Sequence, residues 1–179
     1  MIIIVWFCMA ASELLLAVFL YERCAVSLLD GLALQVLNGW LLWAAYTDLK
    51  DRRITNHWIV CGLCVCVTYL IVKLALFESG WPETLDCVWG ACLGSGILLG
   101  GSMIRKGGIG MGDVKLFFVL GLFCGTERVV VLLMLTLVFA LIVGVARMIL
   151  GKMGGKDRLP LGPFAYLAMI FVIFGRIPG

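Results

Sequence analysis

The chain has 179 residues, of which 63% are hydrophobic and only 14% are charged, and its net charge is +3 at pH 7. Soluble domains carry about 25% charged residues, and a chain with a mean hydropathy of +1.12 has more apolar surface than a core of this size could hide. These values exclude a soluble globular domain, and the small net charge gives no reason to expect nucleic acid as a partner. We therefore predict an all-α, polytopic membrane protein in contact with membrane lipids.

Seven apolar stretches follow one another along the chain, at 1–21, 29–47, 57–77, 85–104, 114–124, 129–150 and 162–175. Most approach the roughly 20 residues that a membrane-spanning helix needs. They predict about seven transmembrane helices in a single membrane-embedded domain, 1–179. The first stretch lacks a positively charged start and contains Glu13, so we expect a retained helix rather than a signal peptide.

Basic residues gather at alternate ends of these stretches. They are Lys50, Arg52, Arg53, Arg105, Lys106, Lys115, Arg147, Lys152, Lys156 and Arg158. Because cytoplasmic loops are enriched in Lys and Arg, this side is predicted to face the cytoplasm, with the N-terminus inside and the C-terminus outside. Asp48 and Asp113 both fall on this side.

The stretch 114–124 is short for a membrane helix. At 1.5 Å per residue it covers about 16 Å, against a hydrocarbon core about 30 Å thick. Either Asp113 starts its helix below the membrane surface, or the turn at 125–128 is buried at the other end. The glycines before Asp113 favour the first alternative.

Asp48 and Asp113 are candidates for a functional pair. Two neighbouring carboxylates can share a proton, with one acting as base on water and the other as acid. The alternative is that both only terminate helices, and Asp113 fits an N-cap well. Asp48 follows a helix, where the macrodipole disfavours a carboxylate. On the residues alone, both interpretations stay open.

The eight cysteines lie mostly inside apolar stretches, where a free thiol behaves as a small hydrophobe. We predict neither a disulfide framework nor a metal site, and no cofactor. His57, the one histidine, has no Cys or Ser partner that would make it catalytic. Two glycine pairs, Gly90/Gly94 and Gly96/Gly100, have the spacing that lets membrane helices approach closely.

Three segments occur in a fixed order: YTDLKDRRITN (46–56), GMGDVKL (110–116) and LPLGPFAYLA (159–168). Together they resemble the motifs of the type IV prepilin peptidases, which are GxGD aspartic membrane peptidases. Thr55 stands where the family usually has proline. The residues that the resemblance marks as supporting are Gly110, Gly112, Lys115, Asn56, Pro160, Gly162 and Pro163.

The resemblance implies that Asp48 and Asp113 are the catalytic pair. It implies an endopeptidase that cuts the leader from type IV prepilin, Flp pilin or pseudopilin-like precursors at the cytoplasmic face of the inner (plasma) membrane. The chain is similar to the compact members, which lack the N-terminal cysteine-containing insertion associated with N-methylation. A non-catalytic membrane carrier, or a factor in pilus or secretion assembly, is the alternative.

Overall fold

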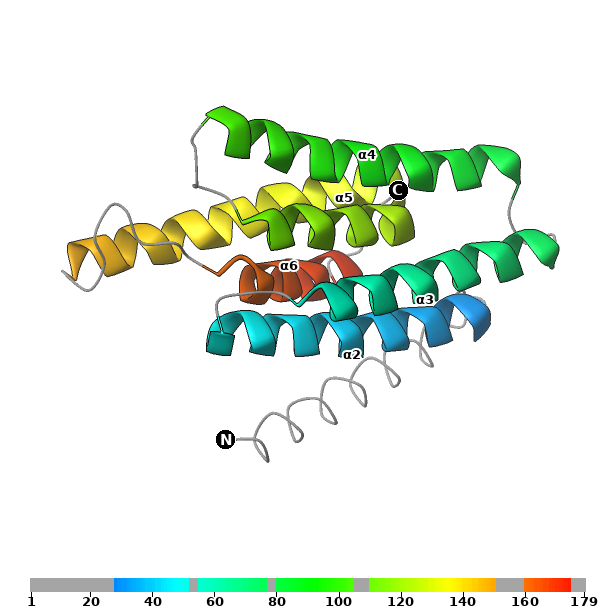
Figure 1. Ribbon diagram of the computed structural model, residues 1–179, viewed down its shortest axis with the longest axis horizontal. Coiled ribbons are helices and arrows are strands. Elements are labelled where there is room, and N and C mark those ends of the chain that lie inside the picture. Colours follow the sequence, from blue (N-terminus) through cyan, green and yellow to red (C-terminus); the bar gives the residue numbers. More distant parts are fainter. Residues whose placement is uncertain (1–27, 52–54, 77–79, 105–109, 151–159, 175–179) are drawn as a thin grey trace.

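The computed structural model describes residues 28–51, 55–76, 80–104, 110–150 and 160–174, and these residues form helices connected by short segments. The helices are α2 (Leu28–Asp51), α3 (Asn56–Ala75), α4 (Trp81–Ile104), α5 (Met111–Ile149) and α6 (Gly162–Phe174). They lie roughly side by side in one bundle (Figure 1). The prediction of an all-α fold is confirmed.

The predicted number of about seven helices is wrong, because the described residues form five. The first predicted stretch, 1–21, lies outside the described residues. The stretches 114–124 and 129–150 both fall within the single element α5, which spans 39 residues. Hydropathy separates the two stretches at the polar residues near position 126. In the structure only Gly125 departs from helical geometry within this region, and the helix resumes directly after it.

α5 is not straight but folds back on itself at Gly125, where φ is 77° and ψ is −179°. Phe117 and Val129 lie on either side of this break, yet both contact Gly94 of α4. A Cβ at Gly94 would lie 3.2 Å from the Phe117 carbonyl oxygen and 2.9 Å from a Val129 methyl carbon. In a straight helix the two residues would be about 18 Å apart along the axis. Figure 1 shows the second half of α5 running back beside the first.

Glycine and an aspartate from α4 make this reversal possible. The positive φ of Gly125 is a conformation that L side chains rarely adopt. The carboxylate of Asp86 accepts a hydrogen bond from the Thr126 backbone N–H at 3.1 Å, and the Thr126 hydroxyl donates to the Asp86 carbonyl at 3.1 Å. Asp86 thus caps the second half of α5 from a neighbouring helix, which satisfies an N–H group at the break.

The glycine pairs of α4 behave differently from each other. A Cβ at Gly90 would lie 2.5 Å from the Gly125 carbonyl carbon and 2.8 Å from the Gly121 carbonyl oxygen. Gly90 and Gly94 therefore allow the close approach to α5 that their spacing predicts. Gly96 and Gly100 have no atom within 4 Å of a Cβ, so the packing role predicted for them is wrong among the described residues.

The structure describes the turn that follows the short stretch 114–124. Gly125 is buried within the bundle, whereas Glu127 and Arg128 are exposed. Which end of this stretch lies below the membrane surface stays a prediction.

α6 packs against both α2 and α5. Ala165, Ala168 and Met169 of α6 are buried in the same core as Leu41 of α2 and Leu120 of α5. Alanines on the buried face of α6 keep the helices close, and a proline in its first turn costs no intrahelical hydrogen bond. α6 therefore helps to set the positions of α2 and α5, together with α3, which also contacts both.

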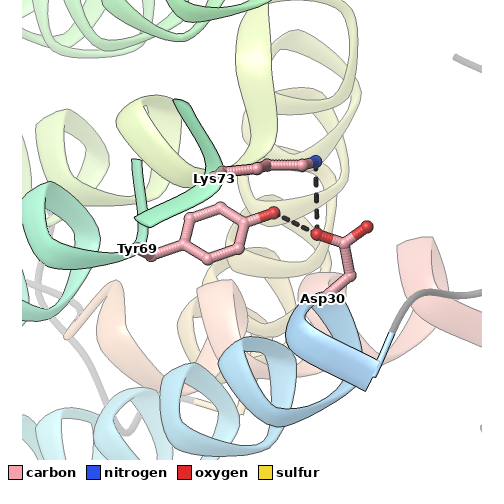
Figure 2. Close-up of polar contacts among 3 residues, drawn as sticks. All are labelled: Asp30, Tyr69 and Lys73. Atoms are coloured by element: carbon pink, nitrogen blue, oxygen red, sulfur yellow. Dashed lines mark hydrogen bonds and ion pairs between the residues drawn. The ribbon is translucent and has the colours of Figure 1, made fainter. Parts of the chain in front are cut away.

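Polar contacts join α2 and α3 at several positions along their length. The Trp40 indole N–H donates to the Trp58 carbonyl at 2.8 Å. Further along, Lys73 of α3 forms an ion pair with Asp30 of α2 at 3.2 Å, and the Tyr69 hydroxyl donates to the same carboxylate oxygen (Figure 2). Among apolar helices, such interhelical bonds fix which faces meet.

Three of the described helices, α3, α4 and α5, are long and apolar enough to cross a membrane. Their outward faces carry large apolar side chains. Val60, Ile71, Trp89, Ile97 and Leu141 are between 46% and 66% exposed. Lipid chains can cover such a surface without cost, whereas water cannot. The chain is therefore an integral membrane protein.

Candidate active site

The two candidate aspartates lie at the same end of the bundle. Asp48 is close to the C-terminal end of α2 and Asp113 is in the first turn of α5, and Figure 1 shows these two helix ends on one side of the molecule. Asp48 is 5% and Asp113 is 9% exposed. The two carboxylates are close enough to interact electrostatically. We call this side the motif end.

Asp48 is held by the start of α6. The Gly162 backbone N–H donates a hydrogen bond to Asp48 Oδ2 at 2.9 Å, and both partners are buried. A Cβ at Gly162 would lie 2.9 Å from that oxygen and 3.1 Å from the Asp48 Cβ. Glycine is needed here because its backbone must approach the carboxylate closely. The N–H is available because the first N–H groups of a helix have no partner within it.

Asp113 lies against the residue that precedes its own helix. Gly110 is the N-cap of α5, and a Cβ there would lie 2.9 Å from Asp113 Oδ2. The Gly110 backbone also hydrogen-bonds the carboxylate. An acidic side chain in the first turn interacts favourably with the helix dipole. The first glycine of the GxGD box therefore provides space for the carboxylate of the last residue.

A polar contact links two further motif segments. The Lys115 ammonium donates to Asn56 Oδ1 at 2.9 Å, which connects the start of α5 to the start of α3. The remaining motif residues lie close in the chain to these contacts. Gly112 is in the first turn of α5, Pro160 lies two residues before the start of α6, and Pro163 is the second residue of α6. All of the predicted site residues thus lie at, or within a few residues of, the helix ends that form the motif end.

The opposite end of the bundle holds polar residues that the sequence did not single out. A cavity of about 750 Å³ lies there, lined by residues of α2, α3, α4 and α5 that include Asp30, Tyr69, Lys73, Asp86 and Gly125. We call this side the far end. The signal that could have located it is Gly125, a glycine followed by polar residues inside an otherwise apolar stretch.

The described residues contain no group of three or more His, Cys, Asp or Glu side chains that could hold a metal ion. The motif end itself offers two interacting carboxyl groups and nearby backbone N–H groups. Such a pair favours a state in which one carboxyl is charged and the other carries a proton.

Comparison with known proteins agrees with this arrangement. The model of the type IV leader peptidase family matches residues 35–145, which include both aspartates and cover more than half of the chain. No curated protein and no solved structure matches the chain. The family model, the membrane helices and the clustered motif residues lead to one conclusion: the chain belongs to the type IV leader peptidase family.

Proposed function

We propose that the protein is an aspartic endopeptidase in which Asp48 and Asp113 form the catalytic pair. The observation that carries the proposal is that two buried carboxylates from different helices interact at one end of the bundle. Burying one carboxylate without a cation is already unfavourable, and placing a second nearby adds repulsion. Such an arrangement is typical of sites where the strained charge state is used in a reaction.

Peptide hydrolysis needs a base, an acid and a water molecule. One carboxylate takes a proton from water, and the other carboxyl group gives its proton to the carbonyl oxygen of the scissile bond. Within the described residues, the backbones of α2 and α5 do not approach each other closely, and both α3 and α6 contact the two helices. An extended segment of substrate and the attacking water would enter between the two carboxyl groups.

The supporting residues have a role in this proposal as well. Gly110 and Gly162 leave room for Asp113 and Asp48, and Lys115 with Asn56 ties α5 to α3. Gly112, Pro160 and Pro163 would shape the turns that begin α5 and α6. Together, residues 1–179 would form one peptidase domain.

The proposed substrates are type IV prepilins, Flp pilins or pseudopilin-like precursors. Family membership supports a leader peptide as the segment that is removed. The basic residues beside the motif segments support a site on the cytoplasmic face of the plasma membrane, because Lys and Arg are enriched on that side. Single cysteines on a cysteine-free background test this orientation. Labelling of positions 52 and 154 from the cytoplasm and of position 80 from outside is expected.

Co-expression with a prepilin-like precursor tests the activity. The wild-type protein should shorten the precursor, and Asp48→Asn and Asp113→Asn should each abolish cleavage while the protein still inserts into the membrane. Gly96→Ala is the control, because it adds a methyl group in open space and should cleave normally. Full cleavage by either Asn variant removes that residue from the pair. If the Asn variants support pilus assembly as well as the wild type does, the protein is an assembly factor instead.

A further inference from the structure

Two cysteines line the cavity at the far end, Cys87 of α4 and Cys124 of α5. Both side chains are half-buried, and their thiols are close enough to interact electrostatically. The cavity has a volume of about 750 Å³, and charged side chains such as Glu83 and Arg128 contribute to its lining. A space of this size with polar walls holds water. The two thiols therefore share a hydrated site, although each lies in an apolar stretch of the sequence.

The packing of α4 on α5 places the two cysteines at the same level. A Cβ at Gly90 of α4 would lie 2.8 Å from the Gly121 carbonyl oxygen of α5, so the two backbones touch there. Because α4 and the first half of α5 run in opposite directions (Figure 1), the residue about one turn before Gly90 lies beside the residue about one turn after Gly121. These residues are Cys87 and Cys124. A disulfide bond needs Cα atoms within about 7 Å of each other, and helices that touch at glycine approach this closely.

The other cysteines that the structure describes have different surroundings. Three of them are exposed on apolar helices, namely Cys61, Cys64 and Cys92. Cys66 lies near both thiols of the pair, but it is fully buried and its thiol donates to the Val119 carbonyl oxygen at 3.7 Å. These four cysteines fit the role of small hydrophobic residues. Among the described cysteines, Cys87 and Cys124 are thus the ones that line the polar cavity, and they do so from two different helices.

We propose that Cys87 and Cys124 are a redox site whose disulfide fastens α4 to the reversal of α5. In the orientation proposed above, the far end lies outside the cytoplasm, where disulfides form and persist. The inference rests on that orientation and not on peptidase activity. Cys124 directly precedes Gly125, so the bond would hold the break in place beside the cap that Asp86 provides. The ring that it closes, 87–124, includes the GxGD box.

The oxidant is a disulfide outside the cytoplasm, and the reaction is thiol–disulfide exchange. One cysteine thiolate attacks a sulfur atom of the oxidant, the S–S bond of the oxidant breaks, and a mixed disulfide forms. The second cysteine thiolate then attacks the sulfur atom of the first cysteine and releases the oxidant. Two electrons and two protons pass from the two cysteines to the oxidant, which leaves as two thiols. The second step is fast because the two cysteines are neighbours in the fold.

Thiol trapping on the full-length protein tests the pairing in cells. The cells are quenched in acid, and the denatured protein is alkylated, reduced, labelled with a second reagent and analysed by mass spectrometry. We expect Cys87 and Cys124 to carry the second label in the wild type, and a linked pair of peptides to be present before reduction. In Cys87→Ser, Cys124 should carry the first label instead. Cys92→Ser is the control on the same helix, and it should leave the bond intact.

Glutathione disulfide provides the same test on the reduced protein in detergent. The wild type should end with the internal bond and release both halves of the oxidant as glutathione. Cys87→Ser and Cys124→Ser should stop at the mixed disulfide and keep one glutathione each. A wild type that keeps glutathione on either residue, a bond that includes Cys66, or two reduced thiols in cells overturns the proposal.

The bond should also raise thermal stability, because it restricts the unfolded chain over residues 87–124. We expect the midpoint of thermal unfolding to be higher by about 5 °C or more in the oxidised than in the reduced wild type. The midpoint of Cys87→Ser should be the same under both conditions. Equal midpoints in the wild type would show that the bond does not fasten the reversal. Cleavage of a prepilin-like precursor is a separate measurement, and its absence in a protein that carries the bond would remove the proposed function while this inference stands.

Discussion

The two ends of the bundle treat carboxylates in opposite ways. At the far end, Asp30 has a lysine and a tyrosine as partners, and Asp86 accepts a backbone N–H at the break of α5. At the motif end, Asp48 and Asp113 are more deeply buried and interact with each other. Among the described residues, the ion pair is the one between Asp30 and Lys73, and it lies at the far end.

This difference separates carboxylates that stabilise the fold from carboxylates that are suited to act on a substrate. A carboxylate that is paired with a cation or caps a helix lowers the free energy of the fold. Two buried carboxylates that face each other raise it, and such a cost is typical of sites that act on a substrate. Variants at the two ends should therefore have opposite effects on stability and on activity.

The largest effect is expected when Asp113→Asn is compared with Asp30→Asn. Asp113→Asn should lower cleavage by about 10³-fold or more, and it should raise the free energy of unfolding by about 1 kcal/mol because a neutral amide avoids the cost of burying an ionisable carboxyl group beside a second carboxylate. Asp30→Asn should keep cleavage near the wild-type level and lower the free energy of unfolding by about 1 kcal/mol. Peptide cleavage and denaturant unfolding in detergent measure both quantities.

That experiment is informative because the two variants are expected to change the free energy of unfolding in opposite directions. Loss of stability in both variants would show that Asp113 is a structural residue like Asp30. Loss of activity in both would show that the far end takes part in the reaction, and the division between the two ends would be wrong.

A smaller effect on activity is expected for Gly110→Ala. The backbone of Gly110 has φ −71° and ψ 140°, which alanine adopts easily. The added Cβ, however, would lie 2.9 Å from Asp113 Oδ2 and should displace that carboxylate. A displacement near 1 Å costs about 10²-fold in rate, whereas stability should change by less than about 1 kcal/mol. Wild-type activity in Gly110→Ala would mean that the position of Asp113 is not critical.

Gly90→Ala should act on stability instead. Its Cβ would meet backbone atoms of Gly125 and Gly121 at 2.5 to 2.8 Å, and backbone cannot rotate away as a side chain can. We expect a loss of about 2 kcal/mol in the free energy of unfolding. Gly100→Ala is the matched control on the same helix, since its Cβ has open space, and it should change stability by at most about 0.5 kcal/mol. Equal effects of the two substitutions would contradict the close packing of α4 on α5.

Much of the motif end could be predicted from the sequence, because its residues stand in short motifs at the ends of apolar stretches. Hydropathy alone predicted helices at Asn56–Ala75 and Trp81–Ile104 within a few residues of their bounds. The motifs named the residues but not their contacts. That the glycine of the third segment donates to Asp48 depends on how α6 packs, which no local pattern encodes.

The far end could not be predicted in the same way. Tyr69 and Lys73 are one turn apart on α3, but Asp30 is 39 residues from Tyr69 in the sequence, so only the packing of α2 on α3 brings it to them (Figure 2). The reversal at Gly125 was expected as a polar turn of several residues. A single glycine is sufficient because Asp86 of α4 caps the following helix, and a long-range cap leaves no local signal.

A smaller effect is expected when the cation of the Asp30–Lys73 ion pair is replaced. The two side chains are 30% and 22% exposed, so solvent screens the pair and weakens it. Lys73→Met keeps the length of the side chain, and it should lower the free energy of unfolding by about 0.5 to 1 kcal/mol with cleavage unchanged. Reduced cleavage in Lys73→Met at normal expression would indicate that the far end is coupled to the motif end.

The smallest effect is expected for the contact between Lys115 and Asn56. Both residues belong to the motif segments, but their 2.9 Å hydrogen bond is exposed, and exposed contacts contribute little because water replaces them. In a double-mutant cycle of Lys115→Met and Asn56→Ala, the coupling energy for unfolding should be about 0.5 kcal/mol or less. Each single variant should retain cleavage within about threefold of the wild type, corresponding to less than about 1 kcal/mol in the barrier. A loss near that of Asp113→Asn would place Lys115 or Asn56 in contact with the substrate, and the motif end would then consist of more than its two carboxylates and the glycines beside them.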